Sequence, residues 1–560
     1  MKNIIKYLPK ILLWALPLLL VVPNVALDIT EQYYSFAARI ANVTLPLGVY
    51  LLLAAWSRNI GRTALFLIPV MVLCAFQIVL LYLYGESIIA IDMFLNVVTT
   101  NYHEASELLR NLGLAIAIVC ALYLPPIVVG AVLCGKKRYT DRPERRSAFL
   151  TGLSASCIGI VAFVAAFFMP GGYNPLRELF PVNVSYNMAM AACRTAQSKE
   201  YKESSADFRF GAHADTDSVP PVIVMVIGET SRADNWQLNG YSRETNPKLS
   251  KRRNLVSFGK ALSESNTTHK SVPLLMSHLS AEHFGDSIYE VKSVISAFDE
   301  AGYHTAWISN QQHNGSLIDF FGQEADSVVF LNEDGLSHHD MELCGELSRF
   351  VADNSEKPLL AVLHTYGSHF NYMERYPSDF SRFEPARDMQ ANRENRGQLI
   401  NAYDNTILYI DAMLDSVASL LEHSGRPAAM LYMTDHGEDI FDDSRERFLH
   451  ASPTPTYWQL HVPVILWMSD TYVAAYPGRM ASAQEHSGLN VSSSRSAFHT
   501  LMSLGNIESP VYDATAALTE KSYCEPTRLY VNDYNEGVRL SRAGLREPDF
   551  AKLMESGISD

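Results

Sequence analysis

The chain has 560 residues, a hydrophobic fraction of 48% and a formal net charge of −15. A nucleic-acid-binding protein needs a basic footprint for the phosphate backbone, so this charge and the lack of a basic arm exclude that class. The length allows several domains. The average composition hides a division, because residues 1–170 hold long apolar runs whereas residues 200–560 have the composition of a water-soluble enzyme.

Five segments in the first part approach or reach the length of about 20 apolar residues that spans a bilayer. They lie near 9–27, 37–56, 63–84, 112–134 and 149–169. The first looks like a signal peptide, but no clear cleavage site follows it and four more spans come after it. We therefore predict a transmembrane domain of five helices over residues 1–170.

Basic residues in the loops predict the orientation of these helices. Lysines precede the first span, Arg58 and Arg62 lie in the second loop, and the stretch 136–146 makes the fourth loop basic. All three loops are expected in the cytoplasm. With five spans, the C-terminal domain emerges on the opposite side of the membrane.

The segment 90–111, between the third and fourth spans, is too polar to cross a membrane. Asn96, Thr100 and Glu104 recur every four residues and so share one face of a helix. Apolar neighbours fit a helix that lies at the membrane interface. The periodicity alone favours a solvated helix face.

Residues 171–220 form a predicted connector, and the second domain covers 221–560. Short apolar, β-branched runs alternate there with helical patterns, which predicts a mostly parallel sheet with helices on both faces. The clearest strands are expected at 222–227, 304–309, 359–364, 428–433 and 462–468.

Polar residues gather after four of these strands. They are Glu229, Asn310, Gln311, His369, Asp435 and His436. In open parallel sheets, ligands bind beyond the carboxyl ends of the strands. We therefore expect these residues to form one site.

Glu229 and the pair Asp435–His436 have the oxygen and nitrogen ligands that zinc takes in tetrahedral sets. An isolated Asp-His pair is more often a turn or a helix N-cap. Combined with a carboxylate that follows a buried strand, the pair favours a metal site.

Several segments resemble those of the phosphoethanolamine transferases, a family of the alkaline phosphatase/sulfatase superfamily that includes enzymes of lipid A modification and of colistin resistance. The segments are VIGETSRADNWQLNGYSRETNPKL (226–249), TTHKSVPLLMS (267–277), TAWISNQ (305–311), LHTYGSHFNY (363–372), NAYDNTILYID (401–411), TDHGED (434–439) and HVPVILW (461–467). They follow the family's order across about 220–505. The resemblance implies a five-span membrane domain and an α/β sulfatase-like domain with a mostly parallel sheet.

The resemblance also implies roles for individual residues. The zinc ligands, for one or two ions, are Glu229, Thr268, Asp435 and His436. Thr268 stands four residues before Val272, which is the family's spacing for its nucleophilic threonine. His369 and His450 match histidines that contact the transferred phosphate or a second metal ion.

The remaining implied contacts concern the substrate. Asn96, Thr100 and Glu104 match a face proposed to contact the head group of the donor lipid, which reverses the preference for a solvated face. Asn310 and Gln311 lie in a matching segment and are predicted to bind substrate.

The nucleophile is predicted to be Thr268 and not its neighbour Thr267. Proline fits the first turn of a helix, so the helix with Pro273 is expected to start near Ser271. Thr268 would then lie close to the positive end of that helix, which favours an alkoxide or a phosphoryl group. Thr267 is expected to stabilise the loop.

The chain departs from the family pattern at three places. Glu264 and Leu274 replace two cysteines that flank the nucleophile loop in the colistin-resistance enzymes, so packing or hydrogen bonds must hold the loop. The family's lysine is missing near 313–316, where His313 is either a phosphate contact or a surface histidine. The sequence SHFN replaces the usual SHGP.

Together, these matches imply transfer of phosphoethanolamine from phosphatidylethanolamine to a surface glycolipid, with lipid A as the expected acceptor. The reaction would pass through a phosphoethanolamine–threonine intermediate. The resemblance places a multi-pass protein among the lipids of the bacterial inner membrane, with its catalytic domain in the periplasm.

Three alternatives fit less well. A sulfatase needs an arginine where Leu275 stands. A phosphoglycerol transferase shares the superfamily and the threonine nucleophile, but its motifs match less closely. A non-catalytic glycan-binding protein predicts loss of metal ligands, and none of the four is lost.

Overall fold

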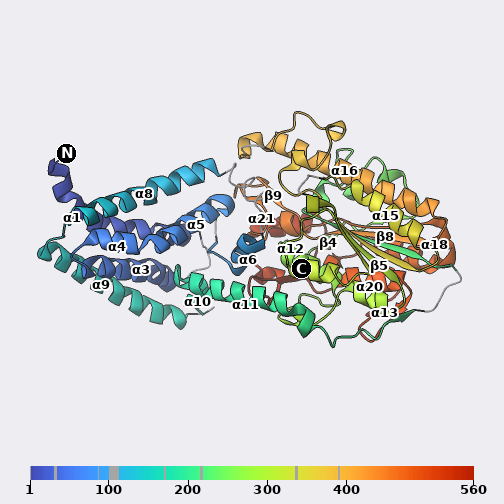
Figure 1. Cartoon of the computed structure of the whole chain (residues 1–560), viewed down its shortest axis with the longest axis horizontal. Helices are drawn as coiled ribbons and strands as arrows, with labels where there is room; N and C mark the ends of the chain where they lie inside the picture. The colour runs from blue at the N-terminus through green and yellow to red at the C-terminus, as the bar shows by residue number, and fades with distance from the viewer. Residues whose placement is uncertain are drawn as a thin grey trace. The chain divides into compact units, whose positions relative to one another are not determined.

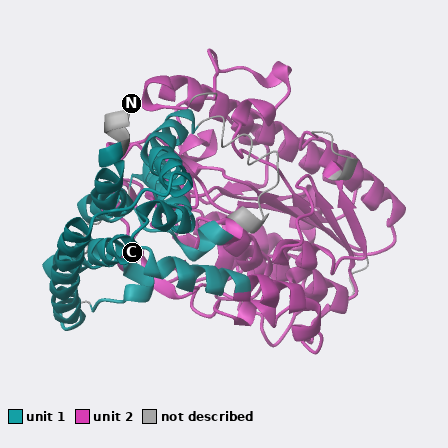
Figure 2. Cartoon of the chain, turned by 60° about the vertical axis from the view of Figure 1, so that its left-hand side comes forward, with its two compact units in different colours: residues 1–94, 108–192 teal, residues 95–107, 193–560 magenta. Residues whose placement is uncertain are grey.

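The structure is a computed structural model, and it describes the chain except residues 1, 31–34, 86, 100–111, 170–171, 215–218, 335–337, 389–390 and 560. It divides into two compact units. Unit 1 comprises residues 1–94 and 108–192, and unit 2 comprises residues 95–107 and 193–560 (Figure 2).

Unit 1 is helical. Its long elements are α1 (Lys2–Leu20), α2 (Val22–Thr30), α3 (Phe36–Trp56), α4 (Ile60–Phe66), α5 (Ile68–Tyr84), α8 (Gly113–Gly135) and α9 (Arg142–Phe167) (Figure 1). In the described part of the chain, four helices or merged helices are long and apolar enough to cross a membrane, and a fifth counts if α4 and α5 form one span. The expected membrane domain of apolar helices is therefore confirmed.

Two of the spans differ in detail from the prediction. The third is bent by 55° between α4 and α5. Pro69 stands in the first turn of α5, where its ring and its missing N–H prevent one continuous helix. The fifth begins at Arg142 and not near 149, because Pro143 opens a charged helical turn before the apolar stretch.

Glycine brings α3 and α9 close together. A Cβ on Gly159 would stand 2.8 Å from the Cα of Leu45. Gly48 and Gly152 on the same two helices are equally crowded by backbone atoms of the partner helix. Small residues allow such close contact between membrane helices.

Helix α6 (Ile91–Thr99) is the described part of the predicted interfacial helix. Asn96 lies in it, whereas Thr100 and Glu104 are outside the described residues. The predicted connector holds α10 (Pro175–Glu178) and the 23-residue helix α11 (Val182–Ser204). Unit 2 includes the end of α11 from Cys193, and its first long strand begins at Val222.

A seven-stranded sheet of order β3-β11-β8-β2-β7-β5-β6 forms the centre of unit 2. Its strands are β2 (Val222–Gly228), β3 (Leu255–Ser257), β5 (His304–Ser309), β6 (Ser327–Phe330), β7 (Leu359–His364), β8 (Ala428–Thr434) and β11 (Val464–Met468). The five predicted strands are all present. The sheet is mostly parallel as expected, but β11 runs antiparallel to both β8 and β3.

Helices cover both faces of this sheet. Figure 1 shows α15 (Glu342–Asp353) and α16 (Arg396–His423) on one side and α13 (Val294–Glu300) and α20 (Ser493–Leu504) on the other. Alternate residues of β2 enter the two resulting cores, so every residue of the strand is buried. This arrangement explains why the strand reads as a continuous apolar run.

The other described elements are short. They are the strand pairs β1 (His213–Ala214) with β13 (Ile507–Glu508), β9 (Asp439–Ile440) with β10 (Phe448–Leu449), β4 (Ala261–Leu262) with β12 (Val491–Ser492) and β14 (Leu529–Val531) with β15 (Gly537–Arg539), and the helices α12 (Thr268–Met276), α14 (Leu317–Gly322), α17 (Tyr457–Leu460), α18 (Asp470–Ala475), α19 (Pro477–His486) and α21 (Glu547–Glu555).

Candidate active site

Two acidic residues emerge side by side at the carboxyl end of the sheet. Glu229 follows β2 and Asp435 follows β8, and the register of these parallel neighbours pairs Gly228 with Thr434. Thr230 adopts a positive φ of 56°, which is strained for a β-branched residue. This conformation lets its N–H donate to Asp435 Oδ1 at 3.0 Å.

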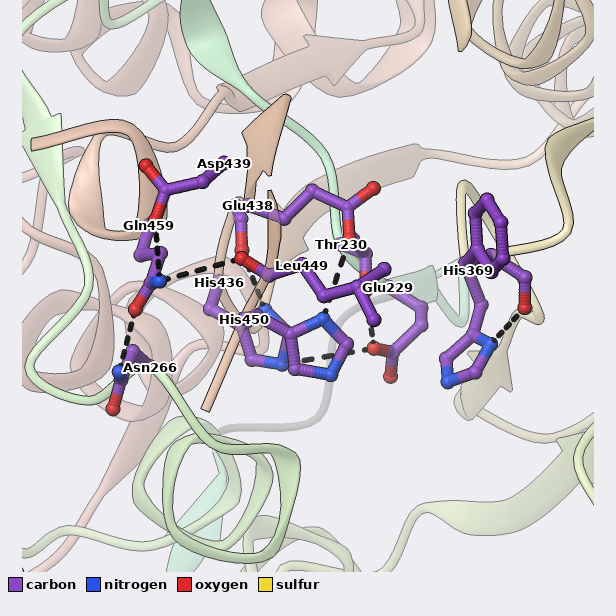
Figure 3. Close-up of polar contacts among 12 residues, drawn as sticks. Glu229, Thr230, Asn266, His369, His436, Glu438, Asp439, Leu449, His450 and Gln459 are labelled. Carbon is purple, nitrogen blue, oxygen red and sulfur yellow. Dashed lines mark hydrogen bonds and ion pairs between the residues drawn. The ribbon is translucent and has the colours of Figure 1, made fainter. Parts of the chain in front are cut away.

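The side chains of Glu229, His436 and His450 meet at one point. Their ligand atoms all lie within 4.8 Å of one another, and Figure 3 shows the carboxylate and the two imidazoles converging. Asp435 Oδ2 is 3.1 Å from His436 Nε2. The structure thus brings together three predicted metal ligands and adds His450, which was predicted as a catalytic histidine.

The two oxygens of Asp435 have different surroundings. Oδ1 accepts hydrogen bonds from the backbone N–H groups of Thr230 and His436. Oδ2 is buried and makes no hydrogen bond among the residues that the structure describes, although His436 Nε2 lies 3.1 Å from it. An orphaned buried carboxylate oxygen is costly, and a cation beside it would remove that cost. The oxygen and nitrogen donors here fit zinc.

Burial dominates the electrostatics of these groups. It raises the pKa of Glu229 to about 8, with a further increase from the neighbouring charge of Asp435. It raises the pKa of Asp435 to about 7. It lowers the pKa of His436, as does the nearby His450. A bound cation would oppose the raised pKa values of the two carboxyl groups and would lower the pKa of His436 further, because it favours carboxylates and neutral imidazole.

Thr268 faces this cluster from the first residue of α12. Its Oγ1 is 3.2 Å from His436 Nε2 and 3.5 Å from Glu229 Oε1. The helix starts three residues before the predicted Ser271, because the N–H groups of Lys270 and Ser271 already donate to the Thr267 carbonyl. Pro273 therefore lies inside the helix and not in its first turn.

Thr267 points elsewhere. Its side chain is buried, and its Oγ1 lies 3.1 Å from Ser265 Oγ. Its carbonyl also accepts a hydrogen bond of 2.8 Å from Ser271 Oγ. These contacts fit the predicted role in stabilising the loop.

Two further histidines border the cluster. The ring of His450 lies 4.2 Å from that of His436 and 5.8 Å from that of His369, measured between centroids. His369 Nδ1 lies 2.7 Å from the carbonyl oxygen of Phe370. A neutral His369 therefore carries its proton on Nδ1 and has a basic Nε2. His450 Nδ1 is oriented by Glu438 Oε2 at 3.4 Å.

The two predicted substrate residues after β5 have different surroundings. Gln311 Nε2 donates to Glu229 Oε2 at 3.2 Å and to the Thr365 carbonyl at 3.0 Å, so it borders the cluster. Asn310 is fully buried, and its amide donates to Asp340 Oδ1 and to the His338 carbonyl. This geometry favours a role in holding the loop over direct substrate contact.

His313 lies on the surface. Its side chain is 46% exposed, with Nδ1 3.8 Å from Asp319 Oδ2 and the ring against Phe330. The structure thus favours the surface interpretation of this residue.

Hydrogen bonds and packing take the place of the family's cysteines. The buried Glu264 accepts from the Ala281 N–H at 3.2 Å and from Ser494 Oγ at 2.8 Å, both on Oε2. Leu274 is fully buried in the core beneath α12. The predicted nucleophile loop is therefore held without a disulfide at these positions.

Sequence reasoning missed a buried amide network behind the site (Figure 3). Gln459 donates to Asp439 Oδ2 at 2.7 Å and accepts from Asn266 Nδ2 at 2.6 Å. Asn266 accepts on its carbonyl from the N–H of Ala451, next to His450. The network links the nucleophile loop to the loop of His450. Asp439 belongs to a recognised motif, but no local pattern marks Gln459 or Asn266.

Comparisons with known proteins agree with this geometry. The sulfatase family profile matches residues 221–507. The phosphoethanolamine transferase EptA of Escherichia coli K12 is 32% identical over 301 residues, which cover 52% of this chain and 54% of that protein. The phosphatidylethanolamine transferase Mcr-1 of Escherichia coli is 30% identical over 404 residues, which cover 67% of this chain and 73% of that protein. The chain thus spans about half the length of the EptA protein it matches.

Two solved structures show the same fold. The lipooligosaccharide phosphoethanolamine transferase EptA of Neisseria meningitidis, an integral membrane protein, aligns with a TM-score of 0.71 at 21% identity, covering 92% of this chain and 99% of that one. The periplasmic domain of Escherichia coli EptC, in complex with Zn, aligns with a TM-score of 0.54 at 24% identity, covering 60% of this chain and 97% of that one.

Proposed function

The chain belongs to the phosphoethanolamine transferase family, whose catalytic domain is sulfatase-like, and from this premise we propose that it transfers phosphoethanolamine from phosphatidylethanolamine to lipid A. One observation carries the proposal. The hydroxyl of Thr268 faces a buried cluster of carboxylates and imidazoles that offers a metal site.

Glu229, Asp435 and His436 would hold a zinc ion, with Thr268 as the fourth ligand. The ion supplies positive charge that lowers the cost of deprotonating a hydroxyl and of gathering phosphate oxygens. His369 and His450 would contact the transferred phosphate or hold a second ion. Two observations support this assignment. Asp435 Oδ2 is buried without a hydrogen bond among the described residues, and the ligand atoms of Glu229, His436 and His450 converge beside it.

The chain's own residues would carry out the transfer in two steps. Thr268 passes its hydroxyl proton to a neutral histidine as its Oγ attacks phosphorus of the donor, an O–P bond forms, and the bond to diacylglycerol breaks. The leaving oxygen takes a proton from a protonated histidine. An acceptor oxygen then attacks the same phosphorus and restores the threonine hydroxyl. His450 is positioned for the proton transfers by Glu438, and His369 has a basic Nε2.

The two lipid substrates explain why the catalytic unit is joined to apolar helices. We propose a bacterial inner-membrane location with unit 2 in the periplasm, which the loop charges support. We also propose that Asn96, Thr100 and Glu104 contact the donor head group, since a carboxylate there would pair with the ethanolamine ammonium.

The test uses the purified full chain with phosphatidylethanolamine and a lipid A acceptor. Peptide mass spectrometry should find phosphoethanolamine on Thr268, and the Thr268→Ala variant should lose transfer. Thr267→Ala is the matched control and should keep a substantial part of the activity. An adduct on Thr267, or full activity in Thr268→Ala, would overturn the assignment of the nucleophile.

A further inference from the structure

A pocket of about 250 Å³ lies beside the helix that carries Thr268. His269 and Lys270, the next two residues of α12, line it. Its other walls come from the second half of α11, the segment 284–289 and the start of α14, with Leu95 of α6 and Asn535 completing the lining. None of the metal-cluster residues lines this pocket. It is therefore a neighbouring space and not the metal site itself.

The charge of the pocket is opposite to that of the whole chain. Arg194, Lys199, His269 and Lys270 line it, and the described lining residues include no aspartate or glutamate. The chain has a net charge of −15, so a lining with several basic groups and no acidic group is not the average surface. Such a lining raises the local concentration of anions.

Two buried hydroxyls also line the pocket. Ser198 Oγ and Ser316 Oγ have no hydrogen-bond partner among the residues that the structure describes. Ser316 precedes α14 but its side chain makes no capping hydrogen bond. Buried hydroxyls in native proteins are nearly always paired, so these two are available to a ligand. Hydroxyls and cations together are typical partners of phosphate oxygens.

The remaining wall is apolar. Phe284, Ile288, Leu317 and Ile318 face the same space. A free inorganic anion would gain nothing from these side chains, whereas the hydrocarbon part of an amphiphile would be removed from water. The combination fits an anionic group that is attached to a lipid.

We propose that this pocket binds the phosphate group of the anionic acceptor lipid and presents it to the phosphoethanolamine on Thr268. The inference rests on the proposed function and deepens it. Phosphatidylethanolamine is a zwitterion whose ammonium would be repelled by this lining, whereas an acceptor phosphate carries net negative charge. The donor therefore fits this pocket less well than the acceptor does.

The chemistry balances for such an acceptor. An oxygen of its phosphate attacks the phosphorus held on Thr268, and a P–O–P linkage forms. The bond between phosphorus and Thr268 Oγ breaks. The proton of the attacking phosphate passes to Thr268 Oγ, so the threonine hydroxyl is restored.

The experiment separates the two half-reactions in the full chain. The acceptor probe is an acylated glucosamine disaccharide 1-phosphate, and its dephosphorylated form is the matched non-ionic probe. Lys199→Glu reverses a charge at the exposed edge of the pocket. Lys202→Glu makes the same change on the same helix outside the pocket, where Lys202 lies over Phe320.

In Lys199→Glu, the adduct on Thr268 should form at the wild-type rate while KM for the phosphorylated acceptor rises roughly tenfold or more. Ser316→Ala removes a hydroxyl that caps no helix and should raise the same KM about threefold. Lys202→Glu should leave KM unchanged. The phosphorylated acceptor should bind the enzyme that carries the adduct on Thr268. Its dephosphorylated form should not compete with it for this binding.

Three results would overturn the proposal. Equal KM values in Lys199→Glu and Lys202→Glu would show that the pocket does not bind the acceptor. A loss of adduct formation in Lys199→Glu would assign the pocket to the donor. Equal competition by the dephosphorylated probe would show that no phosphate is recognised. By contrast, a wild-type chain that forms no adduct on Thr268 would refute the proposed function itself.

Discussion

Different kinds of residue are buried inside unit 1 and inside unit 2. In unit 1, α3 and α9 meet through glycines, while large apolar side chains such as Val161 and Phe168 are 70% and 80% exposed. In unit 2, the tryptophans Trp236, Trp307 and Trp467 are fully buried, and the acidic groups Glu229 and Asp435 are buried as well. Apolar residues such as Val161 and Phe168 can face outward because lipid surrounds a membrane helix, and burying them brings no hydrophobic gain.

This contrast shows how each unit is specified. Helices in lipid are held by close backbone contact, so small residues matter most there. A water-soluble unit is held by apolar burial, so a buried charge is costly and marks a site that serves another purpose. Substitutions in the two units should therefore have different consequences, and the following predictions run from the largest expected effect to the smallest.

The largest effect is expected for Asp435→Asn. The neutral amide cannot offer the orphaned oxygen as an anionic ligand, so zinc content should fall and transfer should drop by more than about 100-fold. Elemental analysis and a transfer assay measure both quantities. Asp443→Asn is the control in the next loop, after β9, where Asp443 pairs with Arg445 and not with the cluster. Equal metal content in the two variants would contradict the metal assignment.

A smaller effect is expected for Gln459→Leu. The variant leaves Asp439 and Asn266 without their buried partner and loosens the link between the loops of Thr268 and His450. We expect kcat to fall about 10–100-fold with zinc retained and KM little changed. Gln459→Glu, which can still accept from Asn266, should keep more activity. A fall in apparent kcat together with loss of zinc and of folded protein would point to general unfolding instead.

Gly159→Leu tests the helix contact in unit 1. The added side chain would collide with the backbone of Leu45, so we expect destabilisation of about 1–3 kcal/mol. A thermal-unfolding assay in detergent measures the change. Val161→Leu is the matched control, because Val161 is exposed on the same helix. The zinc content of the folded fraction should be unchanged, and equal melting temperatures in the two variants would argue against the close contact.

The smallest effect is expected for Glu264→Gln and depends on pH. Burial raises the pKa of Glu264 above its usual 4.5, so the folded state holds the proton more tightly than the unfolded state. The stability from this carboxyl is present below pH 4.5 and is lost as pH rises through the raised pKa. The melting temperature of Glu264→Gln should therefore rise relative to that of the wild type as pH rises above 4.5.

The hydrogen bonds from the Ala281 N–H and from Ser494 both end on one oxygen of the Glu264 carboxyl group, so glutamine can keep these two. Glu264→Leu is the control that loses both and should be less active. A melting-temperature difference between Glu264→Gln and the wild type that does not change with pH would contradict the raised pKa.

The candidate site was predictable where its residues follow buried strands or stand in recognised motifs. Glu229, Asp435 and His436 come directly after strands of the central sheet, so their meeting follows from the parallel order. Asn310 follows a strand in the same way, yet its amide is occupied by Asp340. Position after a strand thus predicts nearness to the site, but the neighbouring side chains decide whether a residue can reach a ligand.

Apolar runs and strand patterns determined the membrane helices and the mostly parallel sheet, and they predicted that residues such as Glu229, Asp435 and His436 would meet after the strands, because these features depend on period, length and local chemistry. Only the tertiary structure decided the bend between α4 and α5, the antiparallel direction of β11 and the start of α12 at Thr268. It alone brought Gln459 to Asn266 and assembled the basic pocket from α11 and α12. The physical reason is that hydrogen bonds and pockets between segments far apart in the chain leave no periodic pattern in the sequence.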